Sequence, residues 1–239
     1  MNTVTAGILL IGDELLSGRT QDTNSGDIAR FLGPLGVQVG EVRMLPDDTE
    51  IIIANVREFS NRFDYVFTTG GIGPTHDDIT ADCIAAAFDL KISERQDAID
   101  ELLVRYKPED LNPARRRMAR IPDGASLIKN PVSLAPGFQT NNVFTLAGVP
   151  QIMRAMLDDI GHRIKGGKAV LQRTIPVKGM GEGDVAGPLG VLAAKFPDLS
   201  FGSYPFFNDG GYGLRIVIRG TDETRLGAAE AALIALLGY

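Results

Sequence analysis

The sequence predicts an α/β fold in which helices cover the faces of a parallel sheet, followed by a small α+β domain. In the first half of the chain, short apolar runs alternate with segments of helical periodicity, which is the pattern of successive β-α-β units. The 239 residues are enough to bury a substantial core. A glycine pair at 166–167 then precedes a different order of elements. These observations predict a main domain at residues 1–167 and a companion domain at residues 168–239.

The first elements along the chain fit this fold. Residues 7–12 (GILLIG) are an almost continuous apolar run, which is typical of a buried strand. Ser25 is the expected N-cap of a helix whose apolar residues fall on one stripe. Residues 37–42 alternate like a strand, Thr49 begins a second amphipathic helix, and residues 65–69 form a strand of β-branched and aromatic side chains. Two β-α-β units are therefore expected in this part of the chain.

The rest of the chain continues with shorter elements. A helix follows the stretch TTGGIGPTHDDIT, with Asp78 or Thr80 as its expected N-cap. Further helices are expected over 94–106 and from Pro150, with a strand between them at 142–147. The companion domain reads as strand, helix, two strands and helix, at residues 169–177, 184–195, 200–204, 213–218 and 221–237. This order predicts an α+β companion without a second active site.

The composition excludes several classes of function. The formal net charge is -6, so the chain lacks the broad basic face that nucleic-acid binding needs. One cysteine and two histidines provide no zinc-type cluster, so any metal should be a hard ion bound by oxygen. The apolar N-terminal run is interrupted by Asp13 and Glu14 and has no basic leader. We therefore expect no nucleic-acid or membrane partner and a cytoplasmic location.

The stretch TTGGIGPTHDDIT, residues 68–80, is the strongest candidate for a binding site. Gly70, Gly71 and Gly73 lie where a strand ends and a helix is about to begin, so main-chain N–H groups could converge on an anion such as phosphate. Their spacing matches neither the dinucleotide fingerprint nor the phosphate loop that ends in Gly-Lys-Ser/Thr. The alternative is that the glycines only make a tight strand-to-helix turn.

Acidic pairs follow three of the predicted strands. They are Asp13 with Glu14, Asp47 with Asp48, and Asp77 with Asp78. Each pair could simply stabilise a helix N-terminus. The carboxyl ends of the strands in an α/β sheet share one crevice, however, where all three pairs could meet. Carboxylates that face a phosphate turn repel the ligand unless a cation such as Mg²⁺ lies between them, so this coincidence favours a metal-dependent phosphate site.

Two further loops supply candidate pocket residues. Ser17 and Asn24, in GDELLSGRTQDTNSGD, could contact a polar ligand at the same edge or belong only to a loop and a helix cap. Residues 130–138 (NPVSLAPGF), which include Pro136 and Gly137, form a second rigid loop of small residues that could wall the pocket.

The basic run NPARRRMAR and His76 each have two readings. The four arginines wrap around a helix, so they form a solvated surface or turn one side toward an anion. His76 lies inside the glycine stretch and is expected to be an exposed turn residue, with proton transfer or phosphate contact as the alternative. No local motif pairs a serine or cysteine nucleophile with a histidine.

The stretch TTGGIGPTHDDIT resembles the GGxGxxxxDxT signature of the MoaB/Mog molybdopterin-binding domain family. Together with GDELLSGRTQDTN near the N-terminus, it is most similar to the N-terminal domains of the CinA-like subfamily. The resemblance covers about residues 5–165, and residues 168–239 are similar to the small domain that follows in this subfamily. It implies a three-layer α/β/α fold with a mostly parallel sheet, and a homo-oligomer.

The resemblance also implies roles for particular residues. It places the phosphates of a nucleotide or pterin at Gly70, Gly71, Gly73, Pro74 and Thr75. It implies catalytic acids at Asp47, Asp78 and Asp13, and Asp47 and Asp78 are the expected ligands of a divalent metal, Mg²⁺ or similar. The further candidate ligand contacts are Asp77, Thr80, Ser17, Asn24, Pro136 and Gly137.

The family resemblance leaves the reaction open between two groups of relatives. In Mog-type proteins these acids serve the adenylylation of molybdopterin. In CinA-like and FAD-synthetase-linked relatives, the domain is associated with metal-dependent cleavage of a nucleotide pyrophosphate such as ADP-ribose or FAD. The GDE, DTN and GPTxDD motifs of this chain point to the second group.

This sequence departs from the family in one loop. The family often reads PGxPxEM there, whereas this chain reads AGVPQIM, with Ala147 for the proline and Ile152 for the glutamate. If that glutamate assists catalysis, its absence favours a module that holds a nucleotide or pterin without turning it over. The amidase domain of longer relatives does not follow in this sequence, so nicotinamide-mononucleotide deamidation is not expected of it.

The leading hypothesis from the sequence is a metal-dependent hydrolase of a nucleotide pyrophosphate. The first alternative is a molybdopterin-binding or adenylylating step in molybdenum-cofactor assembly that uses the same pocket. The second is a non-catalytic module that binds a nucleotide or pterin, and the third is a fold whose glycines and acids only cap turns.

Overall fold

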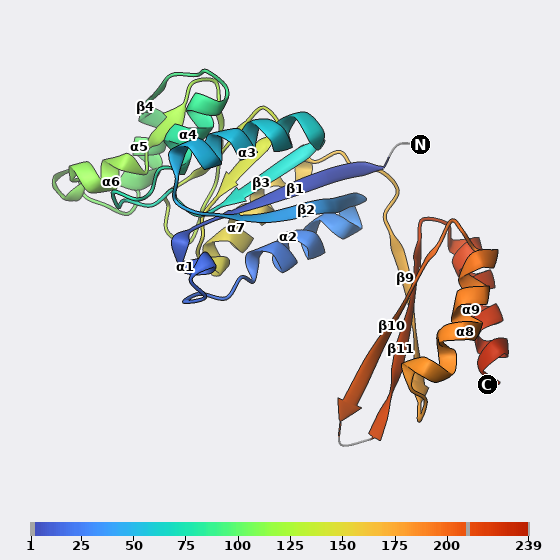
Figure 1. Cartoon of the computed structure of the whole chain (residues 1–239). Helices are drawn as coiled ribbons and strands as arrows, with labels where there is room; N and C mark the ends of the chain where they lie inside the picture. Colours follow the sequence, from blue (N-terminus) through green and yellow to red (C-terminus); the bar gives the residue numbers. More distant parts are fainter. Residues whose placement is uncertain (1–2, 209–210, 239) are drawn as a thin grey trace. The chain divides into compact units, whose positions relative to one another are not determined.

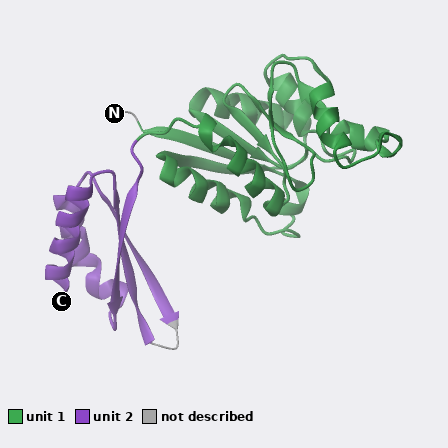
Figure 2. Cartoon of the chain, turned by 180° about the vertical axis from the view of Figure 1, so that it is seen from behind, with its two compact units in different colours: residues 1–167 green, residues 168–239 purple. Residues whose placement is uncertain are grey.

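The computed structural model describes residues 3–208 and 211–238, and the chain divides into two compact units (Figure 2). Unit 1 spans Met1–Gly167 and unit 2 spans Lys168–Tyr239. Each unit has its own sheet and its own hydrophobic core, so each is described by itself. In these two described ranges, every helix is too short or too polar to cross a membrane.

Unit 1 is built on a six-stranded mixed sheet with the strand order β2-β1-β3-β8-β7-β6 (Figure 1). The strands are β1 (Val4–Ile11), β2 (Val37–Leu45), β3 (Tyr65–Thr69), β6 (Ser126–Ile128), β7 (Gly137–Thr140) and β8 (Val143–Leu146). Strands β2, β1, β3 and β8 pair in parallel, and β7 and β6 complete the sheet in antiparallel pairs. Parallel pairing brings the carboxyl ends of β1, β3 and β8 to one edge of the sheet.

Helices cover both faces of this sheet. Helices α2 (Asn24–Leu32) and α7 (Pro150–Ile160) pack on one face, and α3 (Thr49–Arg62) and α4 (Thr80–Ala87) pack on the other. Strand β1 shows the two-residue alternation that separates the two cores, because Ile8 and Leu10 join the first core while Leu9 and Ile11 join the second. The predicted three-layer α/β/α fold with a mostly parallel sheet is therefore confirmed.

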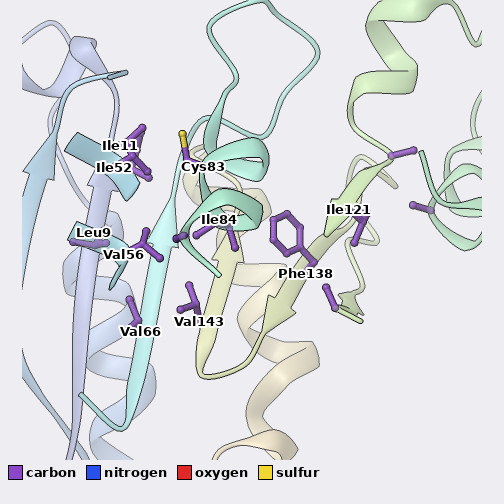
Figure 3. Packing of buried hydrophobic residues seen from close by; sticks show 14 of the residues in the cluster. Leu9, Ile11, Ile52, Val56, Val66, Cys83, Ile84, Ile121, Phe138 and Val143 are labelled. Atoms are coloured by element: carbon purple, nitrogen blue, oxygen red, sulfur yellow. The ribbon is translucent and has the colours of Figure 1, made fainter. Parts of the chain in front are cut away.

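The core beneath α3 and α4 is closed by side chains from distant parts of the chain (Figure 3). Ile52 and Val56 of α3 meet Cys83 and Ile84 of α4 above β1 and β3. Phe138, from the antiparallel strand β7, belongs to the same core and is 1% exposed. The packing therefore fixes the start of α4, and with it the loop that connects β3 to α4.

A segment at residues 92–122 lies between α4 and β6 in the chain. It contains β4 (Ile92–Glu94), α5 (Gln96–Leu103), a 3-10 turn (Pro108–Asp110), α6 (Pro113–Arg117) and β5 (Arg120–Pro122). Strands β4 and β5 form a separate antiparallel pair. The apolar side of α5 joins the core of α3 and α4. The helix predicted over 94–106 is therefore shorter, because its first residue pairs in β4 and its end turns before Pro108.

Short elements account for the other differences from the sequence-based expectations. Helix α2 begins at Asn24 with Thr23 as its N-cap position, and the predicted cap Ser25 lies inside the helix, where its hydroxyl donates to Asp22. Gly137 belongs to β7 and not to the predicted loop. The remaining short helical elements are α1 (Asp13–Leu16) and the 3-10 turns Gly33–Leu35 and Gly161–Arg163.

Unit 2 is a three-stranded antiparallel sheet with two helices. The elements are β9 (Leu171–Lys178), α8 (Glu182–Lys195), β10 (Ser200–Asn208), β11 (Gly211–Gly220) and α9 (Glu223–Leu237), and the strand order is β10-β11-β9. Alternate residues of β11, namely Leu214, Ile216 and Ile218, pack with both helices into one core. The predicted order of strand, helix, two strands and helix is confirmed in this α+β unit.

The central aromatic pair of unit 1 should dominate its stability. Phe67 is fully buried and stacks on Phe144 with ring centroids 5.1 Å apart. We expect Phe67→Ala to lower the free energy of unfolding by about 3–5 kcal/mol, because it leaves a cavity in a close-packed core. Val104→Ala, at a side chain of unit 1 that is 74% exposed, should change it by less than about 0.5 kcal/mol. Urea unfolding of both variants measures the difference, and equal losses would contradict this view of the core.

Candidate functional site

The loops that leave β3 and β8 touch each other at the carboxyl edge of the sheet. A Cβ placed on Gly148, just after β8, would lie 3.2 Å from the Cα of Gly70, just after β3. Asn24 joins the two loops, since its Nδ2 donates to the Gly148 carbonyl at 2.8 Å and to the Thr69 hydroxyl at 3.3 Å. Parallel pairing of β3 with β8 and a buried asparagine therefore hold the loops together.

The first two residues of the glycine turn can only be glycine. Gly70 and Gly71 have φ values of 101° and 66°, a region that side chains disfavour. A Cβ on Gly70 would lie 2.1 Å from the carbonyl oxygen of Ile11, and one on Gly71 would lie 2.2 Å from the hydroxyl oxygen of Thr80. Thr80 closes the turn, because its hydroxyl donates to the Gly70 carbonyl and its N–H donates to the Gly71 carbonyl.

A cleft of about 640 Å³ opens beside this turn. Its size is that of a ligand pocket for a molecule as large as a nucleotide. The apolar part of its lining includes Ile72, Met118, Ala147, Val149 and Ile152. The polar part of its lining comprises Glu14, Thr20, Asp78, Tyr106, Arg115, Asn130 and Ser133. The cleft thus combines an apolar surface with a few polar groups and an exposed stretch of glycine backbone.

Asp13 and Asp47 meet at the ends of β1 and β2. The N–H of Asp13 donates to the Asp47 carboxylate at 3.1 Å, and the N–H of Asp47 donates to the Asp13 carboxylate at 3.4 Å. Burial raises the pKa of the Asp47 carboxyl above its ordinary value, and the negative charges of Asp13, Glu14 and Asp77 raise this pKa further. The first and third acidic pairs are therefore close enough to Asp47 of the second pair to interact with it electrostatically.

Asp78 lies on the wall of the cleft and closes the other end of the glycine stretch. Its carboxylate accepts hydrogen bonds from the N–H and the hydroxyl of Thr75. A Cβ on Gly73 would lie 2.7 Å from the same carboxylate. Arg117 donates to the main-chain carbonyl of Asp78 at 3.1 Å. Asp78 is thus held by its own turn and by the segment at residues 92–122.

The carboxylates do not form a ready-made metal shell. Over residues 3–208 and 211–238, no three His, Cys, Asp or Glu side chains are arranged to hold a metal ion. Carboxylate oxygens are ligands that a hard divalent cation prefers, and among the described residues Asp47 is linked to Asp13, whereas Asp78 is bonded within its own turn. The raised pKa of Asp47 also fits a site in which a cation would offset the negative charge.

Several predicted contact residues serve the fold instead of facing the cleft. The N–H of Gly70 donates to the Leu146 carbonyl, so it is not available to a phosphate. Thr80 is fully buried and its donors close the glycine turn, and both donors of Thr75 are taken by Asp78. Gly137 is packed in β7, where a Cβ would lie 2.5 Å from a carbonyl of β8.

The other predicted contacts lie beside the cleft without lining it. Ser17 is exposed and its hydroxyl donates to the Glu14 carbonyl. Asn24 has one buried oxygen without a partner among the described residues, but its amide nitrogen is used between the two loops. Pro136 lines a separate small recess near Arg117. Asp77 is exposed, as is its neighbour His76. Of the predicted residues, Gly70, Gly71, Gly73, Pro74 and Asp78 line the cleft.

Sequence reasoning missed the far wall of the cleft. Tyr106 and Arg115 come from the segment at residues 92–122, which carries no recognisable motif. Asn130 and Ser133 come from the loop that was predicted to wall the pocket, although other members of that loop were singled out. The basic run around Arg115 was the one available signal, and its spacing favoured a solvated surface over an anion-facing wall.

Comparisons with known proteins agree with this architecture. Residues 7–166 match the family described as "Probable molybdopterin binding domain", and residues 169–238 match the family described as "FAD synthase, middle domain". A crystal structure of the protein CinA from Thermoplasma acidophilum has 34% identity and a TM-score of 0.64, over 68% of this chain and 99% of that one.

Similar curated proteins differ in length. A protein of Archaeoglobus fulgidus is 34% identical over 198 residues, which cover 83% of this chain and 84% of the relative. A CinA-like protein of Prochlorococcus marinus is 32% identical over 230 residues, which cover 90% of this chain and 53% of the relative. Another, from Citrifermentans bemidjiense, is 40% identical over 158 residues and 38% of its length. The chain therefore spans about half or less of these CinA-like relatives.

Replacement of the first glycine of the turn should disrupt the loop packing. Gly70→Ala combines an unfavourable φ with a clash against the Ile11 carbonyl, so we expect a loss of more than about 2 kcal/mol in the free energy of unfolding. Gly18→Ala is the matched control, because Gly18 also has a positive φ, 71°, but no atom within 4 Å of the added Cβ. Its expected cost is about 1 kcal/mol. Urea unfolding compares the two, and a similar loss for both would show that the close approach to β1 is unimportant.

The raised pKa of Asp47 predicts a pH-dependent effect of its removal. Because folded Asp47 keeps its proton to a higher pH than unfolded Asp47, the folded state binds more protons in the range above pH 3.8 and its stability falls there as the pH rises. Asp47→Asn should therefore unfold at a higher temperature than the wild type at pH 7, with this advantage lost near pH 3. Asp158→Asn, at an exposed position outside the cleft, should show no such pH dependence.

Proposed function

The chain belongs to the family of probable molybdopterin binding domains, and from this premise we propose that unit 1 is a metal-dependent hydrolase of a nucleotide pyrophosphate such as ADP-ribose or FAD. The observation that carries the proposal is that one cleft is lined both by a glycine turn and by an aspartate, with a pair of linked aspartates beside it. The glycine turn can bind phosphate through main-chain N–H groups, and an aspartate can activate the attacking water.

The glycine turn binds the phosphates in this proposal. Gly71 and Gly73 line the cleft, and their N–H groups donate no hydrogen bond to another described residue. These two groups replace the three that the sequence suggested, since the Gly70 N–H is used by β8. Glycine at these positions lets a phosphate approach the main chain within hydrogen-bond distance.

The aspartates orient and deprotonate the attacking water. Asp47, whose pKa is raised by burial and by its acidic neighbours, is suited to accept a proton as the water oxygen bonds to phosphorus. The bridging P–O bond breaks, and the products are two phosphomonoesters. Asp13 holds Asp47 through paired main-chain hydrogen bonds, next to Glu14 of the cleft lining, and Asp78 is the aspartate that lines the cleft itself. A divalent cation held by Asp47 and Asp78 would polarise the phosphoryl oxygens when bound.

One feature of the cleft favours a second candidate function. Ala147 and Ile152, which replace a proline and a glutamate common in the family, both line the cleft. The cleft therefore has an apolar surface where relatives of this family often carry a carboxylate. This favours a module that binds a nucleotide or pterin without turning it over, and the same cleft would serve the adenylylation of molybdopterin.

Product analysis separates these functions. We expect purified protein with ADP-ribose or FAD to release AMP only in the presence of a divalent metal such as Mg²⁺. Asp47→Asn and Asp78→Asn should each lower the rate at least about 100-fold, which is the usual contribution of an acid–base group. Asp158→Asn is the control, since this exposed residue lies outside the cleft.

Other outcomes assign the alternatives. Adenylylated pterin from molybdopterin and ATP would support the transferase. Tight binding of any of these ligands without a product would support the binding module and contradict the hydrolase.

A further inference from the structure

Arg115 has a special position among the residues that line the cleft. It is the sole cationic side chain of the lining in the described part of the chain, and the acids Glu14 and Asp78 line the same cleft. Asp13 and Asp47 add negative charge beside it. A phosphate that enters the cleft is therefore repelled by several carboxylates and attracted by one side chain.

The other arginines of the basic run are used by the fold. Arg116 pairs with Glu94, and Arg120 pairs with Asp82. Arg117 donates to the main-chain carbonyl of Asp78. Among the described residues, Arg115 has no carboxylate within 4.0 Å, although Arg116 next to it does. The run thus divides into three structural arginines and one that is free to bind an anion.

The Arg115 guanidinium is held in place before any ligand arrives. It lies 4.4 Å above the ring centroid of Tyr106, which also lines the cleft. Its Nη1 donates to the Asp110 carbonyl, and its main-chain N–H donates to the Asn112 side chain, which caps α6. An arginine has five N–H donors, so most of them remain for a ligand. Because stacking and capping already restrict the Arg115 side chain, it loses less conformational entropy when a ligand binds.

We propose that Arg115 binds the phosphate groups of the ligand, opposite the main-chain N–H groups of Gly71 and Gly73. This inference rests on the proposed function, because it takes the ligand of the same cleft to be a nucleotide pyrophosphate. The planar guanidinium can donate hydrogen bonds to two phosphate oxygens at once. Its positive charge attracts the phosphate, which the acidic side chains of the lining repel. Tyr106 is a positioning residue that orients the guanidinium through its ring.

Binding measurements with ligands that differ only in phosphate test this assignment. Dissociation constants of AMP, adenosine and inorganic pyrophosphate are measured by calorimetry with Mg²⁺ for the wild type, Arg115→Gln and Arg116→Gln. For Arg115→Gln we expect about 10- to 100-fold weaker binding of AMP and pyrophosphate, with adenosine unchanged, because a charge-assisted hydrogen bond to phosphate is lost. Arg116→Gln is the matched control and should bind all three like the wild type.

Several results would overturn the proposal. One is an equal loss of affinity for adenosine and AMP in Arg115→Gln, which would place Arg115 on the base. The others are an unchanged affinity for all three ligands in this variant, and a wild type that binds neither AMP nor pyrophosphate. Urea unfolding checks that Arg115→Gln is folded. If it is not, Arg115→Lys replaces it, and we then expect a smaller but still phosphate-specific loss, because the charge is kept and the fork is removed.

The hydrolase proposal and this inference can fail separately. A wild type that binds AMP through Arg115 but releases nothing from ADP-ribose would contradict the hydrolase and leave the phosphate contact in place. A wild type that hydrolyses ADP-ribose, together with an Arg115→Gln variant that binds AMP normally, would support the hydrolase and contradict the phosphate contact of Arg115.

Discussion

The candidate site depends on one close approach between two backbone segments. The chain that leaves β3 at Gly70 lies against the last residue of β1, Ile11. Gly70 lies so near the Ile11 carbonyl that no side chain fits between them, and Thr80, the first residue of α4, donates its hydroxyl hydrogen bond to the Gly70 carbonyl. Because β1, β3 and β8 are parallel, the loops after all three strands are brought to the same edge. One wall of the cleft is a consequence of this packing, because it includes the glycine backbone that the packing leaves uncovered.

Asp47 carries an electrostatic cost that its hydrogen bonds do not offset. Several carboxylates elsewhere in unit 1 are paired with arginine, such as Asp82 with Arg120 and Asp97 with Arg95. Asp13 and Asp47 instead each accept a hydrogen bond from the main-chain N–H of the other. The hydrogen bond from Asp13 lowers the pKa of Asp47, but burial and the neighbouring negative charges raise this pKa by more. Unrelieved charge of this kind is expected where a ligand or an ion completes the site.

The long elements and the glycine stretch could be predicted from the sequence because both leave a local pattern. Helix α3 shows a clear apolar stripe, and β1 is an apolar run that ends in a glycine and two acids. Strands β5, β6 and β7 contain only three or four residues, too few to show a period. The roles of Thr80 and of the Gly70 N–H, and the place of Arg115, depend on partners far away in the sequence, which spacing alone does not reveal.

The two walls of the cleft differ in how they are made, and this difference bears on function. The wall of Gly71, Gly73 and Asp78 belongs to the edge of the central sheet, whose geometry is set by the core of the unit. The wall of Tyr106 and Arg115 belongs to a segment with its own two-stranded pair, joined to that core through α5. A rigid edge suits the groups that must hold a reacting phosphate in place. In the proposed binding mode, Arg115 adds a positive charge from the outer segment to the main-chain donors of that edge, so phosphate binding depends on both walls.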